Sequence, residues 1–246
     1  MAEAQETRMT DKRLEGFLVL VAGGAGTVGR GIVLSLIDQG AQVVVPARSS
    51  DSFAQLKSRI DSSKTDRLHL IVGDLSSHDA ARTLRDEVTK EWGTPSAIVA
   101  SIGGGAPAPS KIQEMQAETL ESSLDENLVP HFMTLRTFFP LLVGTQGSSY
   151  TIIAGAAGES AWSGYGAMNI PSAALLMMAQ VLSQDAATTA VRTNTIVING
   201  HIANGSAESS EMTVQPRDIG SLAAWLVSPE SNMLTGNVLH VNPRKA

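Results

Sequence analysis

The hydrophobic positions along the chain fall into two patterns that alternate over most of its length. Short apolar runs without polar alternation are typical of strands buried on both faces. Longer segments with apolar residues at helical spacing lie between these runs and predict helices. The predicted strands are 17–21, 42–45, 68–72, 97–100, 149–154, 192–198 and 238–241, and the predicted helices are 32–40, 52–60, 84–92, 117–142, 164–187 and 218–227.

This alternation of strands and helices predicts the fold class. Neither an internal repeat nor a low-complexity linker interrupts it. Because crossovers between parallel strands are right-handed, the pattern favours a single α/β domain with a Rossmann-type, doubly wound parallel sheet of about seven strands. We expect this domain to span residues 13–246 after a flexible N-terminal segment, 1–12. We also expect helix 117–142 to bend at Pro130, since proline removes a helical hydrogen bond.

Composition and charge narrow the functional classes. The net charge of −6, without a cluster of lysine and arginine, argues against nucleic-acid partners. The absence of cysteine excludes disulfides, zinc–thiolate sites and thiol nucleophiles, and we predict no metal site. No uncharged apolar run reaches the ~20 residues that span a bilayer, and residues 1–12 lack the apolar core of a signal peptide. The sequence therefore predicts a cytoplasmic protein without membrane partners.

Two predicted helices are apolar on more of their surface than one sheet can cover. Residues 164–187 are apolar nearly all round, and residues 117–142 are similarly rich in leucine and phenylalanine. Monomers rarely expose apolar patches larger than a few hundred Å². We therefore expect a homo-oligomer, either a homotetramer or a homodimer, with Met177 or Met178 near a subunit contact.

The densest group of glycines follows the first predicted strand. Residues 22–29 read Ala-Gly-Gly-Ala-Gly-Thr-Val-Gly and lead directly into the first predicted helix. Glycines let a backbone approach a pyrophosphate closely, and the free N–H groups of a helix's first turn point toward it. A strand, a glycine turn and a helix N-terminus in this order predict a dinucleotide site. A plain strand–helix turn is the alternative interpretation.

Several motifs in a consistent order resemble those of the short-chain dehydrogenase/reductase family, over the whole chain. The glycine turn resembles the family's T-G-x-x-x-G-x-G, and two later segments, 192–200 and 234–241, resemble its C-terminal motifs. Tyr165 stands where the family has the tyrosine of Y-x-x-x-K. The resemblance implies a small-molecule substrate with a carbonyl, alcohol or activated double bond, and Tyr165 as proton donor or acceptor.

The resemblance also implies the remaining site residues. Asn127 and Asn169 take the positions of the other catalytic residues beside Tyr165. The implied cofactor contacts are Gly23, Ala25, Thr27, Val28, Gly29, Arg48, Ser49, Asp74, Leu75, Ser101, Gly103, Asn169, Gly200 and Ile202.

The chain departs from the family's pattern at two positions that matter for catalysis. The strand that ends in the family's catalytic serine continues here into Gly155, and Asn169 replaces the lysine four residues after Tyr165. Free tyrosine ionises near pH 10, and a neighbouring positive charge lowers an acid's pKa by ~1–3 units, which an asparagine cannot do. Two hypotheses follow: an oxidoreductase in which Tyr165 works in an unusual environment, and an NADP(H)-binding protein or non-redox catalyst that has lost hydride transfer.

The end of the second predicted strand bears on the choice of cofactor. NAD-specific proteins of this architecture usually place an acidic residue there to bind the ribose hydroxyls. Here Ala47 is followed by Arg48 and Ser49, and a guanidinium beside a hydroxyl suits a 2′-phosphate. The sequence therefore favours NADP(H). If Arg48 only stacks on the adenine, NAD(H) would also bind.

Three further side chains have both a functional and a structural interpretation. Asn127 could hold a water molecule, as the resemblance implies, or bond to a local backbone group. His131 lies one turn later on the same helix face, and a lone helical histidine is usually structural. His201 follows Gly200 at the carboxyl end of a strand, where open sheets bind ligands, although an ordinary loop histidine would look the same.

Overall fold

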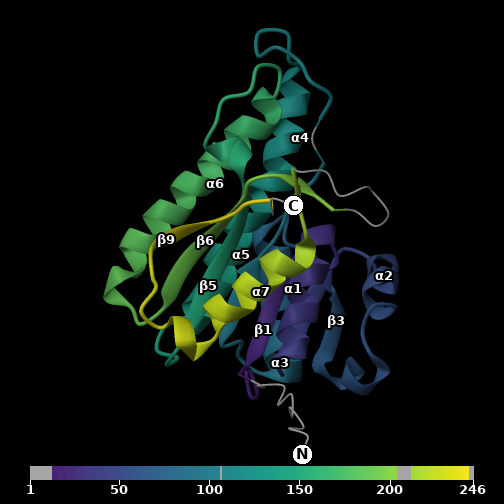
Figure 1. Cartoon of the computed structure of the whole chain (residues 1–246), viewed down its shortest axis with the longest axis vertical. Coiled ribbons are helices and arrows are strands. Elements are labelled where there is room, and N and C mark those ends of the chain that lie inside the picture. The colour runs from purple at the N-terminus through teal and green to yellow at the C-terminus, as the bar shows by residue number, and fades with distance from the viewer. Residues whose placement is uncertain (1–12, 106, 204–211, 244–246) are drawn as a thin grey trace, which may run out of the picture.

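The computed structural model describes residues 13–105, 107–203 and 212–243 (Figure 1). The predicted flexible segment 1–12 lies outside the described residues. The strands are β1 (Leu18–Ala22), β2 (Gln42–Ala47), β3 (Leu68–Val72), β4 (Ala97–Ala100), β5 (Ser149–Gly155), β6 (Arg192–Ile198), β7 (His201–Ile202), β8 (Thr213–Val214) and β9 (Asn237–Val241). The α-helices are α1 (Thr27–Asp38), α2 (Ala54–Lys57), α3 (His78–Trp92), α4 (Ala117–Asn127), α5 (Val129–Leu142), α6 (Gly166–Asp185) and α7 (Pro216–Val227). Short 3₁₀ helices cover Ser50–Phe53, Ser62–Arg67, Ala156–Gly158, Ala186–Thr188 and Pro229–Ser231.

Seven strands form one parallel sheet in the order β3-β2-β1-β4-β5-β6-β9. The chain builds from β1 outward to β3 and then returns to the other side of β1 to build from β4 to β9. This is the doubly wound Rossmann arrangement, so the predicted fold class is confirmed. The strand order reverses between β1 and β4, and open sheets bind ligands outside the carboxyl ends of their strands at such a point.

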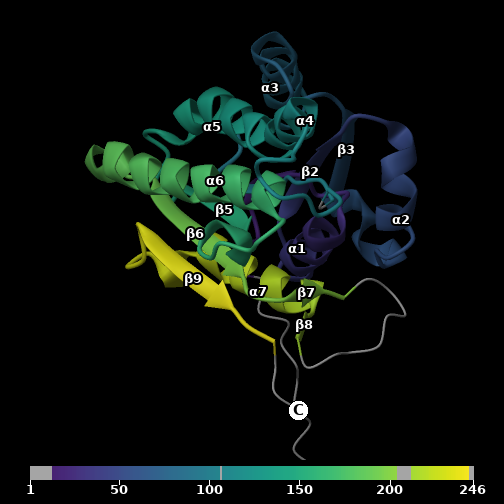
Figure 2. The same ribbon diagram turned by 90° about the horizontal axis from the view of Figure 1, so that it is seen from above.

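Helices cover both faces of this sheet (Figure 2). α1 and α7 pack together on one face, whereas α3, α4, α5 and α6 lie on the other. Successive side chains of β1 pack on opposite faces of the sheet. Val19 and Val21 belong to the apolar cluster that contains Ile32, and Leu20 belongs to the cluster that contains Phe138. Because both faces are buried, the strands need apolar residues at successive positions, which explains their continuous apolar runs.

The segment predicted as one bent helix, 117–142, is two helices. α4 ends at Asn127 and α5 begins at Val129, and Leu128 between them has a φ of −121° and a ψ of −52°. Pro130 lies in the first turn of α5, where a missing N–H is tolerated because it would have no helical partner. The expected bend at Pro130 is therefore corrected to a break at Leu128.

Two other segments differ from the prediction. The expected helix 52–60 is the 3₁₀ turn Ser50–Phe53 followed by the single-turn helix α2. The short pair β7–β8 was not predicted, because strands of two residues have no detectable periodicity.

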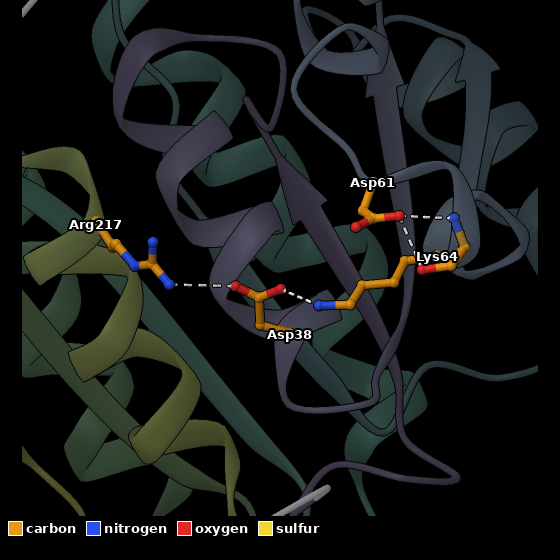
Figure 3. Close-up of polar contacts among 5 residues, drawn as sticks. Asp38, Asp61, Lys64 and Arg217 are labelled. Carbon is orange, nitrogen blue, oxygen red and sulfur yellow. Dashed lines mark hydrogen bonds and ion pairs between the residues drawn. The ribbon is translucent and has the colours of Figure 1, made fainter. Parts of the chain in front are cut away.

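Asp38, at the C-terminal end of α1, joins α1 to two other segments (Figure 3). Its Oδ1 lies 2.5 Å from Lys64 Nζ, and its Oδ2 lies 3.5 Å from Arg217 Nη2 in α7. The two cations offset the unfavourable interaction of a carboxylate with the negative end of a helix dipole. Beside them, the N–H and hydroxyl of Ser63 donate to Asp61, and the N–H bond is the main cause of the lowered pKa of Asp61. The ion pairs are exposed, so each contributes under about 1 kcal/mol.

Arg192, the first residue of β6, is a buried guanidinium bound mainly by main-chain oxygens. Its Nη1 donates to Leu226 O at 2.7 Å and to Ser231 Oγ at 2.8 Å, and its Nη2 donates to Gly147 O at 3.2 Å. Burial lowers the pKa of Arg192 by desolvation. The C-terminal end of α7 supplies Leu226 O, and the negative end of a helix dipole favours a cation there. Arg192 therefore fixes α7 to the sheet.

One described helical stretch, Gly166–Thr188, is long and apolar enough to cross a membrane by length and composition alone. Its buried residues, among them Leu175 and Leu182, pack in the core cluster on one face of the sheet. A core helix passes the same test, so this is weak evidence for a membrane span. The cytoplasmic location stays a prediction.

Candidate active site

The chain turns sharply between β1 and α1 at the glycines predicted to bind a pyrophosphate. Gly23 has a φ of +78°, which favours glycine, and a Cβ at this position would lie 2.1 Å from Ser101 O. A Cβ at Gly29 would lie 2.1 Å from Gly23 O. The turn therefore packs directly on the end of β4 and on α1. Gly26 is the N-cap of α1, whose first N–H groups have no helical partner and suit an anion.

Arg30, in the second turn of α1, stabilises the shape of the glycine turn. Its Nη1 donates to Ala25 O at 2.8 Å, and its Nη2 lies 3.5 Å from Thr27 Oγ1. Burial lowers the pKa of Arg30, and the positive charge of Arg59 lowers it further. The guanidinium therefore places a positive charge beside the turn, where it favours an anionic ligand.

A cavity of about 350 Å³ lies at the carboxyl ends of the central strands, where the strand order reverses. Its walls come from the glycine turn, the ends of β2 and β3, the loop after β4, and the end of α4. The predicted cofactor positions that line it are Gly23, Ala25, Arg48, Asp74, Leu75, Ser101 and Gly103. The other predicted positions lie outside the lining that the described part of the chain forms: Thr27, Val28, Gly29, Ser49, Asn169, Gly200 and Ile202.

The cavity lining contains charges of both signs. Arg48 follows β2, and three carboxylates, Asp74, Asp125 and Glu126, also line the cavity. The N–H of Ser76 donates to Asp74 Oδ1 at 3.0 Å, and the hydroxyl of Ser76 donates to Asp74 Oδ2. Asp125 and Glu126 were not predicted as site residues, although they directly precede Asn127, a predicted catalytic residue on the same helix.

Tyr165 is the N-cap of α6 and is 37% exposed. Its ring stands edge-on to Trp162, with the ring centroids 6.3 Å apart and an angle of 89° between the planes. The neighbouring main chain is tied to the loop after β4, because Ser110 N donates to Gly164 O at 2.8 Å. A Cβ at Gly166 would lie 3.0 Å from Met115 Cε. The phenol is therefore partly open to solvent beside Trp162, and Tyr165 is not among the described residues that line the cavity.

Asn169 bonds to the segment that precedes α6. Its Nδ2 donates to Ala157 O at 2.7 Å and to Ser160 O at 2.8 Å, and its Oδ1 accepts from Trp162 N at 3.2 Å. The amide is thus occupied on both sides by the backbone of residues 157–162. A hydrogen bond from Asn169 to a ribose would require one of these contacts to open or to be shared.

Asn127 also bonds to the backbone rather than to open space. Its Nδ2 donates to Ser123 O at 2.9 Å, and its Oδ1 accepts from Gly104 N at 2.8 Å. Gly104 belongs to the loop after β4 that lines the cavity. Asn127 therefore holds this loop against α4, in agreement with the structural interpretation of its side chain.

The two candidate histidines occupy different environments. His131 is fully buried in α5, its Nε2–H donates to Ile102 O at 2.9 Å, and burial lowers its pKa to about 4. It is therefore neutral at physiological pH and is held under the loop after β4. His201 is exposed in β7, and its backbone N–H donates to Met212 O at 2.8 Å.

The comparison with known families settles the classification. The sequence matches the family described as enoyl-(acyl carrier protein) reductase over residues 23–243. The chain belongs to the short-chain dehydrogenase/reductase family. The resemblance inferred from the motifs is thereby confirmed, and the protein is an oxidoreductase of the short-chain dehydrogenase/reductase type.

Relatives with similar sequences or structures span nearly the whole chain. It is 25% identical to 2,3-dihydroxy-2,3-dihydro-p-cumate dehydrogenase of Pseudomonas putida, over 93% of this chain and 94% of that protein. An NADPH-bound short-chain oxidoreductase of Pseudomonas aeruginosa, described as containing an atypical catalytic centre, has a TM-score of 0.81 at 19% identity and covers 93% of this chain and 96% of its own. A short-chain dehydrogenase of Shigella flexneri in complex with NADP has a TM-score of 0.83 at 20% identity, and the match covers 94% of this chain and 98% of that protein. At these identities the two structures show a shared fold.

Proposed function

We propose that this short-chain dehydrogenase/reductase binds NADP(H) and transfers a hydride to or from a small molecule with a carbonyl, an alcohol or an activated double bond. The cavity at the strand-order reversal is the observation on which this proposal depends. Its glycine turn leaves no room for a Cβ at Gly23, and Arg48 lines it at the end of β2. A glycine turn that leads directly into the free N–H groups of a helix N-terminus fits a dinucleotide pyrophosphate.

The choice of NADP(H) rests on Arg48. Arg48 is one of the residues that line the cavity, and a guanidinium can bind a 2′-phosphate through two parallel hydrogen bonds. The NADPH-bound and NADP-bound neighbours of the same fold support this choice. When bound, the nicotinamide supplies the hydride. The chain's own residues hold the phosphates at the glycine turn and at Arg48, with Gly103 and Ser101 bordering the cavity.

We propose Tyr165 as the group that moves the proton. A phenol can give a proton to a substrate oxygen that gains charge as the hydride arrives, so prior ionisation is unnecessary. Gly155 and Asn169 stand at the positions where the family pattern has serine and lysine, and we propose that the chain is an atypical member in this respect. Asn169 supports the segment 157–162 through its hydrogen bonds, and Asn127 supports the loop after β4.

A second candidate function is binding of NADP(H) without hydride transfer. Asn169 is uncharged, and its amide already donates to Ala157 O and Ser160 O. This position therefore gives Tyr165 no neighbouring cation, which favours the second function. The double variant Gly155→Ser with Asn169→Lys separates the two candidates. A gain of carbonyl reduction that the parent lacks supports the binding function, whereas loss of an existing activity in a variant that remains folded shows that the unusual residues serve catalysis.

Turnover with NADPH tests the proposed function. The protein is incubated with NADPH and a panel of ketones, quinones and enones, and the absorbance of the reduced nicotinamide is followed. We expect consumption of NADPH with at least one class and slower consumption with NADH. Tight binding of NADPH without turnover of any compound would favour the second candidate.

We further propose that the protein is a homodimer or homotetramer assembled through α5 and α6. Exposed apolar side chains lie on both helices: Phe132 on α5, and Ile170, Met177 and Val181 on α6. Met177 is 57% exposed, whereas the neighbouring Met178 packs against the core. Light scattering should report a multiple of the 25.8 kDa chain mass at micromolar concentration. A particle of one chain mass would overturn this proposal.

A further inference from the structure

Ser123 is a buried hydroxyl between α4 and the start of α6. Its side chain is 3% exposed and donates a hydrogen bond to the main-chain oxygen of Ala167. Ala167 lies two residues after Tyr165, in the first turn of α6. A single side chain on α4 therefore contacts the beginning of the helix that Tyr165 precedes.

Pro171 explains why Ala167 needs a donor from outside its own helix. In a regular α-helix the N–H of residue 171 would donate to the oxygen of residue 167, but proline has no N–H. Ala167 is itself buried, and a buried carbonyl oxygen without a donor is unfavourable. The hydroxyl of Ser123 supplies the hydrogen bond that Pro171 removes.

The same face of α4 and α5 holds the loop that lines the cavity. Asn127, one turn after Ser123, donates to Ser123 O at 2.9 Å and accepts from Gly104 N at 2.8 Å. His131, one further turn along, donates to Ile102 O at 2.9 Å. Ser123, Asn127 and His131 thus follow one another at a spacing of four residues. Ser123 bonds to α6, whereas Asn127 and His131 bond to the loop that lines the cavity.

We propose that Ser123 is a positioning residue that fixes the start of α6, and with it Tyr165, relative to the loop 102–104 that lines the cofactor cavity. This inference rests on the proposed function, in which Tyr165 moves a proton while the cavity holds the cofactor. The Ser123 hydroxyl donates to Ala167 O on one side, and on the other side it lies 3.4 Å from Asn127 Nδ2. Without its hydroxyl, the first turn of α6 must shift to find another donor for Ala167 O, and the phenol moves with it.

Hydrogen exchange and steady-state kinetics of Ser123→Ala test the proposal. The amides of Met168 and Asn169 both donate to Tyr165 O, so their exchange reports the first turn of α6 directly. We expect their exchange to speed up by about tenfold or more. We expect kcat to fall by about ten- to a hundredfold while KM changes little, because a displacement near 1 Å is enough for such a loss. Ser122→Ala, at an exposed neighbour on the same helix, is the matched control, and Ser123→Thr should retain most of kcat.

Pro171→Ala provides the rescue. It restores an N–H that can donate to Ala167 O, so the double variant Ser123→Ala with Pro171→Ala should recover most of the exchange protection and of kcat. Effects of Ser123→Ala no larger than those of Ser122→Ala would overturn the proposal. So would additive effects in the double variant, or failure of both Ser123→Ala and the double variant to fold.

The experiment separates this inference from the proposed function. If the wild-type protein transfers no hydride, the proposed function fails. The exchange rates of Met168 and Asn169 with and without Pro171→Ala then still decide whether Ser123 fixes the start of α6. If the wild type transfers hydride but Ser123→Ala changes neither exchange nor kcat, only the positioning role fails.

Discussion

Asn169 and Ala157 are joined by a hydrogen bond of 2.7 Å from the side-chain amide of the first to the main-chain oxygen of the second. The same amide reaches Ser160 O and Trp162 N, so one side chain organises the whole segment between β5 and α6. Trp162 in turn packs edge-on against Tyr165. In the proposed function, Asn169 thus supports the surroundings of the proton donor in place of supplying a charge.

Replacement of Asn169 by lysine should destabilise the protein. A lysine side chain cannot accept from Trp162 N, and its longer chain would displace the segment if the ammonium is to donate to Ala157 O and Ser160 O. We expect Asn169→Lys to lower the free energy of unfolding by about 1–3 kcal/mol. Gly155→Ser is the matched control, since a Cβ at Gly155 meets nothing within 4 Å and its φ is −101°. Urea unfolding of both variants measures the difference, and equal stabilities would contradict the role given to Asn169.

Arg48→Ala should weaken NADPH binding selectively. Loss of a charged hydrogen bond costs about 1.5–3 kcal/mol, so the dissociation constant for NADPH should rise by roughly ten- to a hundredfold. The affinity for NADH should change little, because NADH has no 2′-phosphate. Arg59→Ala removes an exposed arginine beside Arg30 and serves as the control. Equal losses for both cofactors in calorimetric titrations would show that Arg48 does not bind the 2′-phosphate.

Acid should destabilise the protein through His131. Burial lowers its pKa to about 4 in the folded chain, whereas a free histidine has a pKa near 6.5. The unfolded chain therefore binds a proton that the folded chain excludes as the pH falls from about 6.5 to about 4, and stability decreases over that window by about 3 kcal/mol. His131→Gln keeps a donor for Ile102 O and should lose this part of the pH dependence. Identical pH profiles of the unfolding free energy in both proteins would contradict the assignment.

Arg192→Met should cost more stability than loss of an exposed arginine. The variant keeps a long side chain but leaves Leu226 O and Gly147 O without the guanidinium donors. We expect a loss of about 2–3 kcal/mol, the range for hydrogen bonds to a buried charged group. Arg217→Met breaks only the exposed pair with Asp38 and should cost under about 1 kcal/mol. Thermal unfolding compares the two, and a smaller loss for Arg192→Met would contradict its role at the end of α7.

The sheet could be predicted because its signals are local. Val19, Leu20 and Val21 face alternate layers that are both buried, so the strand is visible as an uninterrupted apolar run. The glycine turn was visible for a similar reason, since residues 22–29 concentrate glycines between a strand and a helix. Right-handed crossovers favour the doubly wound arrangement, whereas the strand order that places these glycines at the reversal point comes from the structure.

The details of the site could not be predicted because they depend on contacts between distant segments. The acceptors of Asn169 are loop carbonyls without a sequence pattern, and the break at Leu128 depends on how α4 and α5 pack. The bond between Ser123 and Ala167 crosses forty-four residues of sequence. Pro171 was a usable signal, since a proline inside a predicted helix implies a carbonyl oxygen four residues earlier that needs another donor.

Transfer of deuterium from NADPH that carries deuterium in place of both hydrogens at the nicotinamide C4 tests the central claim most directly. Each compound of the carbonyl and enone panel is incubated with the labelled cofactor and either the wild type or Tyr165→Phe, and the products are analysed by mass spectrometry. We predict one deuterium in the product of the wild type, and a rate lower by about a hundredfold or more for Tyr165→Phe with unchanged NADPH affinity. Bound NADPH without label in any product, or equal rates in both proteins, would contradict the account.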